Sequence, residues 1–130
     1  MLSGAVIEPG QAVEHVLLGD AAHPTLQSLA QGACMAIEDA VSLAQSIVAA
    51  GGDFTAAFAR YEAARVMRTA RVQLESRSLW EFYHAADIAR DVRSLTVADW
   101  TEQHMFDCLA WLYDGPAEQK ATVLKPLQSL

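Results

Sequence analysis

Apolar residues recur every three or four positions through the middle of the chain. After residue 32 the repeating small and apolar residues are Ala33, Ala36, Ile37, Ala40, Leu43, Ala44 and Ile47. This spacing predicts an amphipathic helix from about residue 33 to residue 50. Gly51 and Gly52 follow it, and glycine accepts the left-handed backbone that commonly ends a helix. Asp53 then suits the N-cap of a second helix.

The second predicted helix carries an apolar stripe at its start. Phe54, Phe58 and Tyr61 follow one another at helical spacing, so we predict a helix from residue 54 to about residue 77. Five arginines lie along it, either as a solvated face or as partners for the acidic surplus of the chain. They are Arg60, Arg65, Arg68, Arg71 and Arg77.

Two further helical stretches are expected near the end of the chain. The first covers residues 79–89, and residues 91–95 are predicted to break it. Thr96 and Asp99 then resemble a capping box for a last helix. Gly115-Pro116 would stop that helix, and the tail beyond it has one weak amphipathic turn. One face of the last helix would hold Val97, Trp100, His104, Cys108 and Trp111.

The first part of the chain has strand character. Residues 12–18 end in Val16-Leu17-Leu18, a short apolar run before glycine, which suits a buried strand. A turn at residues 8–10 would make this segment a hairpin. The sequence therefore predicts a mainly α chain, with a short N-terminal strand or hairpin followed by about four helices.

Composition narrows the classes of function. The chain has 130 residues, of which 52% are hydrophobic, enough for one domain with a core. A formal charge of −7 argues against nucleic acids and anionic membranes as partners. Cys34 and Cys108 show neither metal spacing nor a disulfide framework, which fits a reduced, cytoplasmic setting. Residues 1–15 form no signal-peptide core, and we expect no apolar run of the roughly 18 residues that span a bilayer.

Candidate chemistry gathers between residues 16 and 43. Asp20 follows the predicted strand, where a carboxylate can accept hydrogen bonds from sugar-like hydroxyls or simply cap a turn. Gly32 lacks a Cβ and lets a ligand approach the backbone closely. Free N–H groups at Gly32, Ala33 and Cys34 would favour an anion, although an ordinary helix start looks the same.

This segment also resembles a known family. Residues 19–23 read Gly-Asp-Ala-Ala-His, and Pro24 follows; residues 30–32 read Ala-Gln-Gly and residues 38–40 read Glu-Asp-Ala. This order is similar to the second FAD-binding motif of the aromatic-ring hydroxylases, the single-component flavoprotein monooxygenases. Gln27, with Arg-Val-Gln at 71–73 and Trp-Leu-Tyr at 111–113, looks most like the 3-hydroxybenzoate 6-hydroxylase branch, next to the salicylate hydroxylases.

The resemblance implies a function for a larger enzyme. It implies NAD(P)H- and O₂-dependent hydroxylation of a phenolic acid with bound FAD. Separately, we expect a homodimer, because uncovered helix faces favour self-association, and the charge argues against nucleic-acid and membrane partners. The chain lacks a strand followed by Gly-x-Gly-x-x-Gly, the usual ADP-binding fingerprint. It thus looks like the C-terminal portion of a larger α/β flavoprotein, a cloned fragment or a truncated gene product. Residues 1–50 would belong to the FAD-binding domain and residues 51–130 to a C-terminal helical region.

The resemblance also assigns roles to individual residues. Gln27 would contact the aromatic substrate, unless it is only a loop amide. His23, before Pro24, would more readily fix the loop than move a proton in catalysis. The predicted FAD contacts are Gly19, Asp20, Pro24, Gln31, Gly32, Ala33 and Cys34.

Other polar residues have simpler interpretations. Glu38 and Asp39 are expected to pair with a nearby arginine or to bracket the helix. His104 and Cys108 are too few for a metal site, so a core position is expected for them. A hypothesis from another class makes the chain a non-catalytic dimerisation or assembly module, because its second half carries more aromatic surface than a small domain readily hides.

Overall fold

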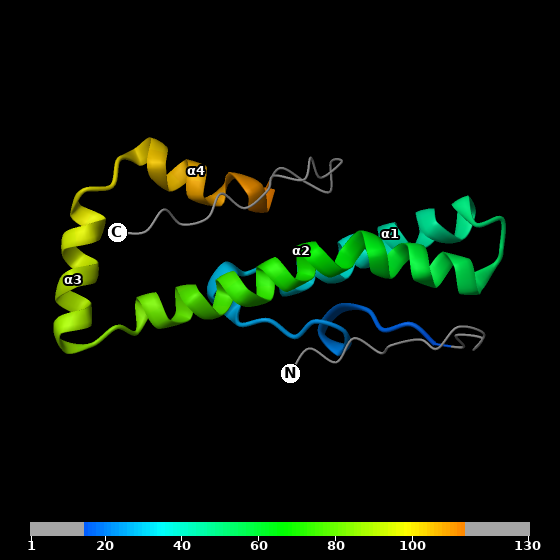
Figure 1. Ribbon diagram of the computed structural model, residues 1–130, viewed down its shortest axis with the longest axis horizontal. Coiled ribbons are helices and arrows are strands. Elements are labelled where there is room, and N and C mark those ends of the chain that lie inside the picture. The colour runs from blue at the N-terminus through cyan, green and yellow to red at the C-terminus, as the bar shows by residue number, and fades with distance from the viewer. Residues whose placement is uncertain (1–14, 114–130) are drawn as a thin grey trace. The chain divides into compact units, whose positions relative to one another are not determined.

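The computed structural model describes residues 15–113 and is mainly helical in this part (Figure 1). The expected turn at residues 8–10, the helix stop at Gly115-Pro116 and the tail lie outside the described residues. The elements are two short 3₁₀ helices, η1 and η2, and four α-helices, with these bounds: η1 Gly19–Ala21, η2 Gln27–Leu29, α1 Gly32–Ala49, α2 Phe54–Tyr83, α3 Asp87–Ala98 and α4 Glu102–Tyr113.

The predicted N-terminal strand is wrong for the residues that can be described. Residues 15–18 have no regular structure, and no strand occurs between residues 15 and 113. Leu18 has extended backbone angles, φ −132° and ψ 155°, but a strand also needs a neighbouring strand for its hydrogen bonds. The carbonyl of Leu17 instead accepts a hydrogen bond from the Tyr61 hydroxyl at 3.3 Å. Local propensity therefore predicted the extended backbone but not its partner.

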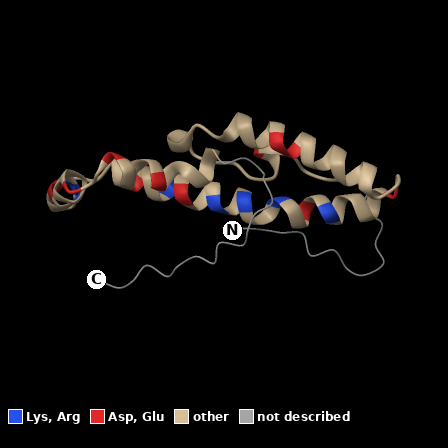
Figure 2. Cartoon of the chain, turned by 90° about the horizontal axis from the view of Figure 1, so that it is seen from above, with Lys and Arg blue, Asp and Glu red and all other residues tan. Residues whose placement is uncertain are grey.

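α1 and α2 form a helical hairpin, side by side in two views (Figures 1 and 2). The turn between them uses Gly51 and Gly52 with φ of 61° and 90°, as the sequence predicted. Asp53 caps α2, because its side chain accepts a hydrogen bond from the Ala56 N–H at 3.0 Å. The buried apolar side chains of the hairpin include Met35, Ala57, Tyr61 and Val72.

The later helix boundaries differ from the prediction. α2 continues through Tyr83 instead of ending near residue 77, and α3 covers the predicted break at residues 91–95. Those five residues contain neither glycine nor proline, so nothing local interrupts a helix there. The capping box was also wrong: the Thr96 hydroxyl bonds within α3 to the Val92 carbonyl at 3.0 Å. Thr101 takes the capping role, accepting from the His104 N–H at 3.1 Å.

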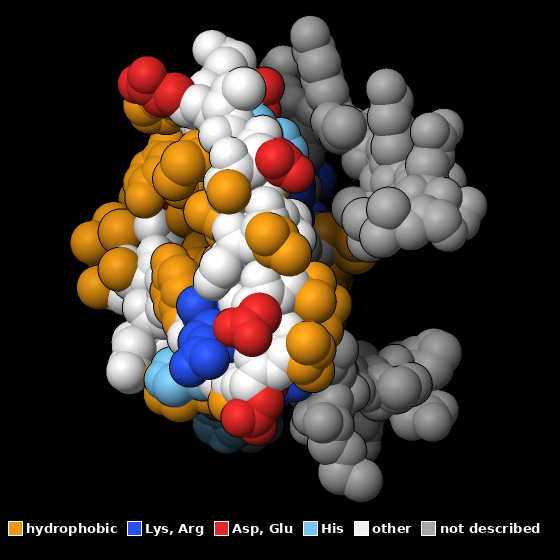
Figure 3. Space-filling model, turned by 90° about the vertical axis from the view of Figure 1, so that its left-hand side faces the viewer, with side chains coloured by type: hydrophobic (Ala, Val, Ile, Leu, Met, Phe, Trp, Pro, Cys, Tyr) orange, Lys and Arg blue, Asp and Glu red, His pale blue; other side chains and the backbone are white. Residues whose placement is uncertain are grey.

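The chain separates into two compact units after Ala85, and each is described by itself. The second unit contains α3 and α4. His104 and Cys108 of α4 are exposed, so the expectation of a core position was wrong for both. Figure 3 shows hydrophobic side chains among charged ones on the face that α3 presents. The division predicted at residue 50 concerns the larger enzyme and stays a prediction.

One face of α1 is apolar and exposed. Ile37, Val41 and Val48 keep between 51% and 81% of their surface accessible. By length and composition alone α1 could cross a membrane, although Glu38 and Asp39 interrupt it and it holds no unbroken apolar run of the expected span length. The core helix of a soluble protein meets the same criterion. α1 also carries Glu38 and Asp39, whose charges are neutralised by α2 as described below.

Candidate functional site

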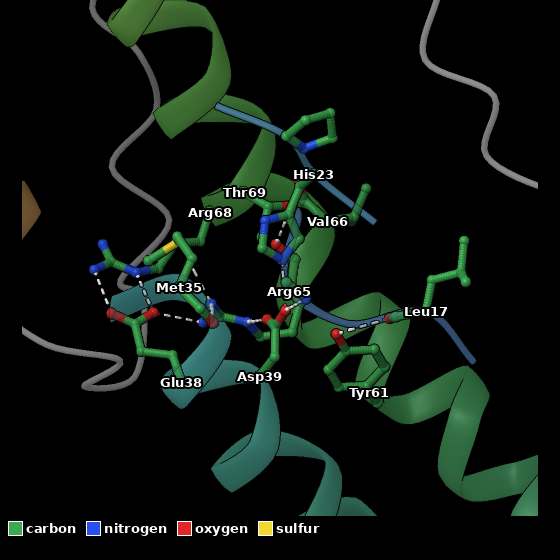
Figure 4. A network of polar contacts seen from close by, with 12 residues as sticks. Leu17, His23, Met35, Glu38, Asp39, Tyr61, Arg65, Val66, Arg68 and Thr69 are labelled. Atoms are coloured by element: carbon green, nitrogen blue, oxygen red, sulfur yellow. Dashed lines mark hydrogen bonds and ion pairs between the residues drawn. The ribbon is translucent and has the colours of Figure 1, made fainter. Parts of the chain in front are cut away.

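Asp39 is the centre of a polar network between α1, α2 and the loop before α1 (Figure 4). It is fully buried, and its Oδ2 accepts a hydrogen bond from the Gly19 N–H at 2.8 Å. The same oxygen lies 2.5 Å from Nε2 of His23. Oδ1 accepts from Nε of Arg65 at 2.7 Å. One carboxylate thus joins the second helix to both ends of the Gly-Asp-Ala-Ala-His segment.

Glu38 extends the network to a second arginine. Arg68 donates to both carboxylate oxygens of Glu38, from Nε to Oε2 at 2.7 Å and from Nη2 to Oε1 at 2.8 Å. Arg65 donates a further bond to Glu38 at 2.7 Å. Paired hydrogen bonds of this kind are the stronger and more specific form of an arginine–carboxylate contact. Arg65 therefore bridges Glu38 and Asp39, while Arg68 forms a two-point contact with Glu38.

The charges of this network explain its pKa shifts. Burial alone would raise the pKa of Glu38, but the hydrogen bonds and positive charges of Arg68 and Arg65 outweigh it and lower the pKa. Burial likewise opposes ionisation of Asp39, and the Gly19 N–H, His23 and Arg65 together hold its pKa below the usual range. Both groups are therefore carboxylates at neutral pH.

The expected pairing of Glu38 and Asp39 with arginine is confirmed. The alternative of a solvated arginine face is wrong for two members of the strip, because Arg65 and Arg68 are each only 5% exposed. They stand three residues apart on α2 and so face α1 together. Figure 2 shows the arginines along α2 and the acidic pair of α1 in the neighbouring helix.

The Asp20 side chain lies beside Gly32, the first residue of α1. A Cβ placed on Gly32 would stand 3.7 Å from Oδ1 of Asp20 and 3.8 Å from a methyl carbon of Thr25. Asp20 is exposed within η1, and its neighbour Gly19 is buried with φ of 57°. A Cβ on Gly19 would approach that of Ala36 to 3.2 Å. Glycine is thus needed at residue 19 for packing and for backbone conformation.

The following loop, residues 24–28, is bonded to α2. The Pro24 carbonyl accepts a hydrogen bond from Nε2 of Gln73 at 3.1 Å. Thr25 donates from its hydroxyl to the Ser76 hydroxyl at 2.9 Å. Ser28 donates to the Ser76 backbone carbonyl at 2.6 Å. Both ends of the loop therefore depend on one turn of α2.

The structure divides the predicted site residues into exposed and buried ones. Gln27 is exposed, and His23 is buried against Asp39, a contact that gives its ring a structural role. A catalytic role for either residue stays a prediction. Asp20, Pro24, Ala33 and Cys34 are exposed, Gly32 is half-buried, and Gly19 and Gln31 are buried. Among these residues, Asp20 and Gly32 lie close to each other at the start of α1.

Sequence reasoning missed the supporting residues on α2. Gln73 entered only as part of the branch resemblance and Ser76 only as a helix position, yet both hold the loop that carries Gln27. The available signal was weak: two small or amide residues, one turn apart, on the face that also holds Arg65 and Val72. Between residues 15 and 113 no group of three or more His, Cys, Asp or Glu side chains could hold a metal.

Comparison with known proteins finds aromatic hydroxylases that are similar to this chain. It is 46% identical over 97 residues to 3-hydroxybenzoate 6-hydroxylase of Klebsiella oxytoca, covering 75% of this chain and 24% of that enzyme. It is 43% identical over 106 residues to 3-amino-4-hydroxybenzoate 2-monooxygenase of Streptomyces cremeus, covering 78% of this chain and 25% of that protein.

A further relative has the cofactor in its name. The FAD-dependent urate hydroxylase of Mycolicibacterium vanbaalenii is 41% identical over 71 residues, covering 55% of this chain and 18% of that enzyme. The chain spans about a quarter of the length of the first two curated hydroxylases named above, 24% and 25%. No family model and no solved structure matches. The resemblance is confirmed: over three quarters of its length the chain is similar to part of the enzymes named 3-hydroxybenzoate 6-hydroxylase.

Proposed function

We propose that this chain forms part of the FAD and substrate site of a monooxygenase that hydroxylates a phenolic acid of the 3-hydroxybenzoate or salicylate type. The larger enzyme would use NAD(P)H and O₂. The observation that carries the proposal is the position of Asp20, whose carboxylate lies beside Gly32 at the start of α1. This places a hydrogen-bond acceptor next to backbone N–H donors on an exposed surface.

The residues present fit a flavin. Gly32 leaves a space that a Cβ would fill, and Asp20 borders it. Asp20 would accept hydrogen bonds from ribitol hydroxyls, while the N–H groups of Gly32, Ala33 and Cys34 would face the polar edge of the isoalloxazine ring. The positive end of the α1 dipole would favour negative charge at that edge. When bound, FAD supplies the electron transfer and oxygen activation that amino-acid side chains cannot.

Gln27 is the proposed substrate contact. Its amide can both donate and accept a hydrogen bond, as recognition of a phenolic hydroxyl or a carboxylate requires. It is exposed on η2, between Pro24 and Gln31, two of the proposed flavin contacts. His23 would fix this segment through Asp39, which leaves proton transfer to the substrate as its less favoured role.

A chimeric enzyme tests this function. The matched 97-residue stretch of the Klebsiella 3-hydroxybenzoate 6-hydroxylase would be replaced by that of this chain. We expect a yellow protein that converts 3-hydroxybenzoate to 2,5-dihydroxybenzoate with NAD(P)H and O₂. The unaltered Klebsiella enzyme is the control. A folded chimera that binds no FAD, or one that oxidises no substrate, would contradict the proposal.

A second candidate function is a non-catalytic assembly module. The observation that favours it is apolar surface on the second unit, where Ile88 and Leu95 of α3 are 76% and 72% exposed. On α4, Phe106 is 64% exposed. A colourless, stable dimer of the 130-residue chain, combined with a chimera that lacks FAD, would favour this function over the enzymatic one.

A further inference from the structure

Gln73 and Ser76 of α2 hold the loop of residues 24–28, which carries the proposed substrate contact Gln27. Ser76 is fully buried and Gln73 is 8% exposed. They stand one turn apart on α2, and the Ser76 hydroxyl also donates to the Gln73 carbonyl at 3.0 Å. Their positions are therefore set by the helix and not by the loop.

The contacts reach the loop on both sides of Gln27. Gln73 binds the Pro24 carbonyl and Ser76 accepts from Thr25, both before Gln27. Ser28, directly after Gln27, donates to the Ser76 carbonyl at 2.6 Å. The loop lacks long-range bonds of regular structure, so these side-chain contacts restrict where the exposed Gln27 amide can lie.

We propose that Gln73 and Ser76 are positioning residues for the substrate site, acting through the loop that carries Gln27. This inference rests on the proposed function for its consequence in catalysis, but the clamp itself can be tested without it. Neither residue would touch substrate or flavin. Loss of the clamp should therefore leave FAD bound while the substrate is placed less accurately, and reduced flavin would then react with O₂ without hydroxylating the ring.

The first experiment measures the clamp in the 130-residue chain by hydrogen–deuterium exchange. Ser76→Ala and Gln73→Ala should each speed exchange of the Ala30 N–H, which donates to the Gln27 carbonyl at 2.8 Å, about fivefold, as expected for one lost hydrogen bond of about 1 kcal/mol. Thr25→Val removes the partner hydroxyl, so adding Ser76→Ala to it should have little further effect. Ser78→Ala is the matched control, because Ser78 is exposed on the same helix and bonds only to Leu74.

The second experiment measures function in the chimera. Ser76→Ala and Gln73→Ala should raise KM for 3-hydroxybenzoate severalfold and lower the product formed per NAD(P)H oxidised, with peroxide released instead. FAD content and the flavin spectrum should match those of the unmutated chimera and of Ser78→Ala. A merely structural role would lower the unfolding temperature and FAD content together, and would leave coupling unchanged in the folded protein.

The outcomes separate the two proposals. Unchanged exchange of the Ala30 N–H in both variants would overturn the clamp, whatever the chimera does. Faster exchange with wild-type coupling and KM would overturn the positioning role, provided that the unmutated chimera is active. If exchange is faster in the variants but the unmutated chimera has no hydroxylase activity, the clamp is retained. The proposed function is then overturned, and with it the catalytic part of this inference.

Discussion

Asp39 shows how one side chain can organise a site that it does not form. Its two oxygens contact Gly19 and His23 on one side and Arg65 on the other. Asp20, the proposed flavin contact, lies between Gly19 and His23 in the sequence. Its orientation therefore depends on Asp39, a buried residue 19 positions later. A buried carboxylate is stable only when its charge is matched and its lone pairs are occupied, and Arg65 and the Gly19 N–H provide both.

The stability of the hairpin should therefore fall at low pH. The pKa values of Glu38 and Asp39 are lowered in the folded chain. A lowered folded-state pKa gives stabilisation that is complete above the unfolded pKa, about 4 for both residues, and is lost as the pH falls through the folded-state value. We expect the unfolding temperature, measured by circular dichroism, to be nearly constant from pH 7 to 5 and to fall below about pH 4.

A variant isolates the contribution of Asp39. Asp39→Ala should lower the free energy of unfolding by about 3 kcal/mol at neutral pH, because Arg65 stays buried with only part of its hydrogen bonding. The variant should also lose less stability than the unmutated chain when the pH falls. Asp91→Ala removes an exposed pair with Arg90 and should change stability by less than about 0.5 kcal/mol. Equal stability of the two variants at pH 7 would show that the buried network is not needed for folding.

Asp20 should act on flavin binding and not on folding. In the chimera, Asp20→Ala should weaken FAD binding by about 1.5–3 kcal/mol, or roughly 10- to 150-fold, because a charged acceptor for ribitol hydroxyls is lost. Titration by flavin fluorescence measures this change. Glu62→Ala, at an exposed position of α2, is the control. FAD affinity equal to that of the control would refute the assignment of Asp20.

At the level of elements, local sequence rules succeeded where the structure is locally determined. The bounds of α1, the glycine turn and the Asp53 cap all follow from residues within a few positions of one another. The N-terminal strand failed because sheet formation depends on a partner elsewhere in the chain. The break at residues 91–95 failed because charged residues alternate there without any residue that stops a helix.

The sequence predicted that Glu38 and Asp39 pair with arginine, but not which arginine each of them contacts. The motif indicated Asp20 and Gly32 as neighbours of one ligand, and the structure brings them together. The contacts of Asp39 with Arg65 and of Thr25 with Ser76 span 26 and 51 residues. No local pattern encodes such pairings, since they depend on the register with which α2 packs on α1 and on the loop.

The register of α1 against the loop can be tested at Gly19. Gly19→Ala should destabilise the hairpin by about 1–3 kcal/mol, since a non-glycine residue is strained at φ of 57° and its Cβ would also meet Ala36 at 3.2 Å. Gly51→Ala is the matched control, with φ of 61° and nothing within 4 Å of the added Cβ. Urea unfolding compares the two variants.

The difference between these variants is the informative quantity. Both carry the cost of a left-handed alanine, of about 1 kcal/mol. The excess cost at residue 19 therefore reports the close approach between the loop and α1. If the two variants unfold at the same urea concentration, the packing of Gly19 on Ala36 makes no contribution, and the glycine is required only for its backbone conformation.

At the level of the whole molecule, exposed apolar surface is the dominant feature of both units. In the first unit it lies on α1, at Ile37, Val41 and Val48, and in the second on α3 and α4. Patches of this kind in water favour association. Because the chain spans about a quarter of the relatives it matches, such surface is also what a portion of a larger enzyme would present to the remainder.

These features predict the behaviour of the 130-residue chain on its own. FAD is a long cofactor, and in our proposal Asp20 and Gly32 contact one part of it, while the chain has no Gly-x-Gly-x-x-Gly loop for the ADP part. Without the contacts to the ADP part, most of the binding free energy is lost, because the cost of immobilising the cofactor remains. We therefore expect a colourless or faintly yellow protein that oxidises no NAD(P)H with 3-hydroxybenzoate or salicylate, even with added FAD.

The same chain should associate with itself through its exposed apolar surface. Gel filtration with light scattering should show a dimer or a larger species, and an absorbance scan of the same fractions should show little or no flavin. Replacing Ile88 and Leu95 with glutamate should shift the chain toward the monomer if α3 contributes to association, whereas Val48→Glu tests α1 in the same way. A monomer that carries stoichiometric FAD and turns over substrate would contradict both expectations, because it would show that the chain forms a complete hydroxylase site by itself.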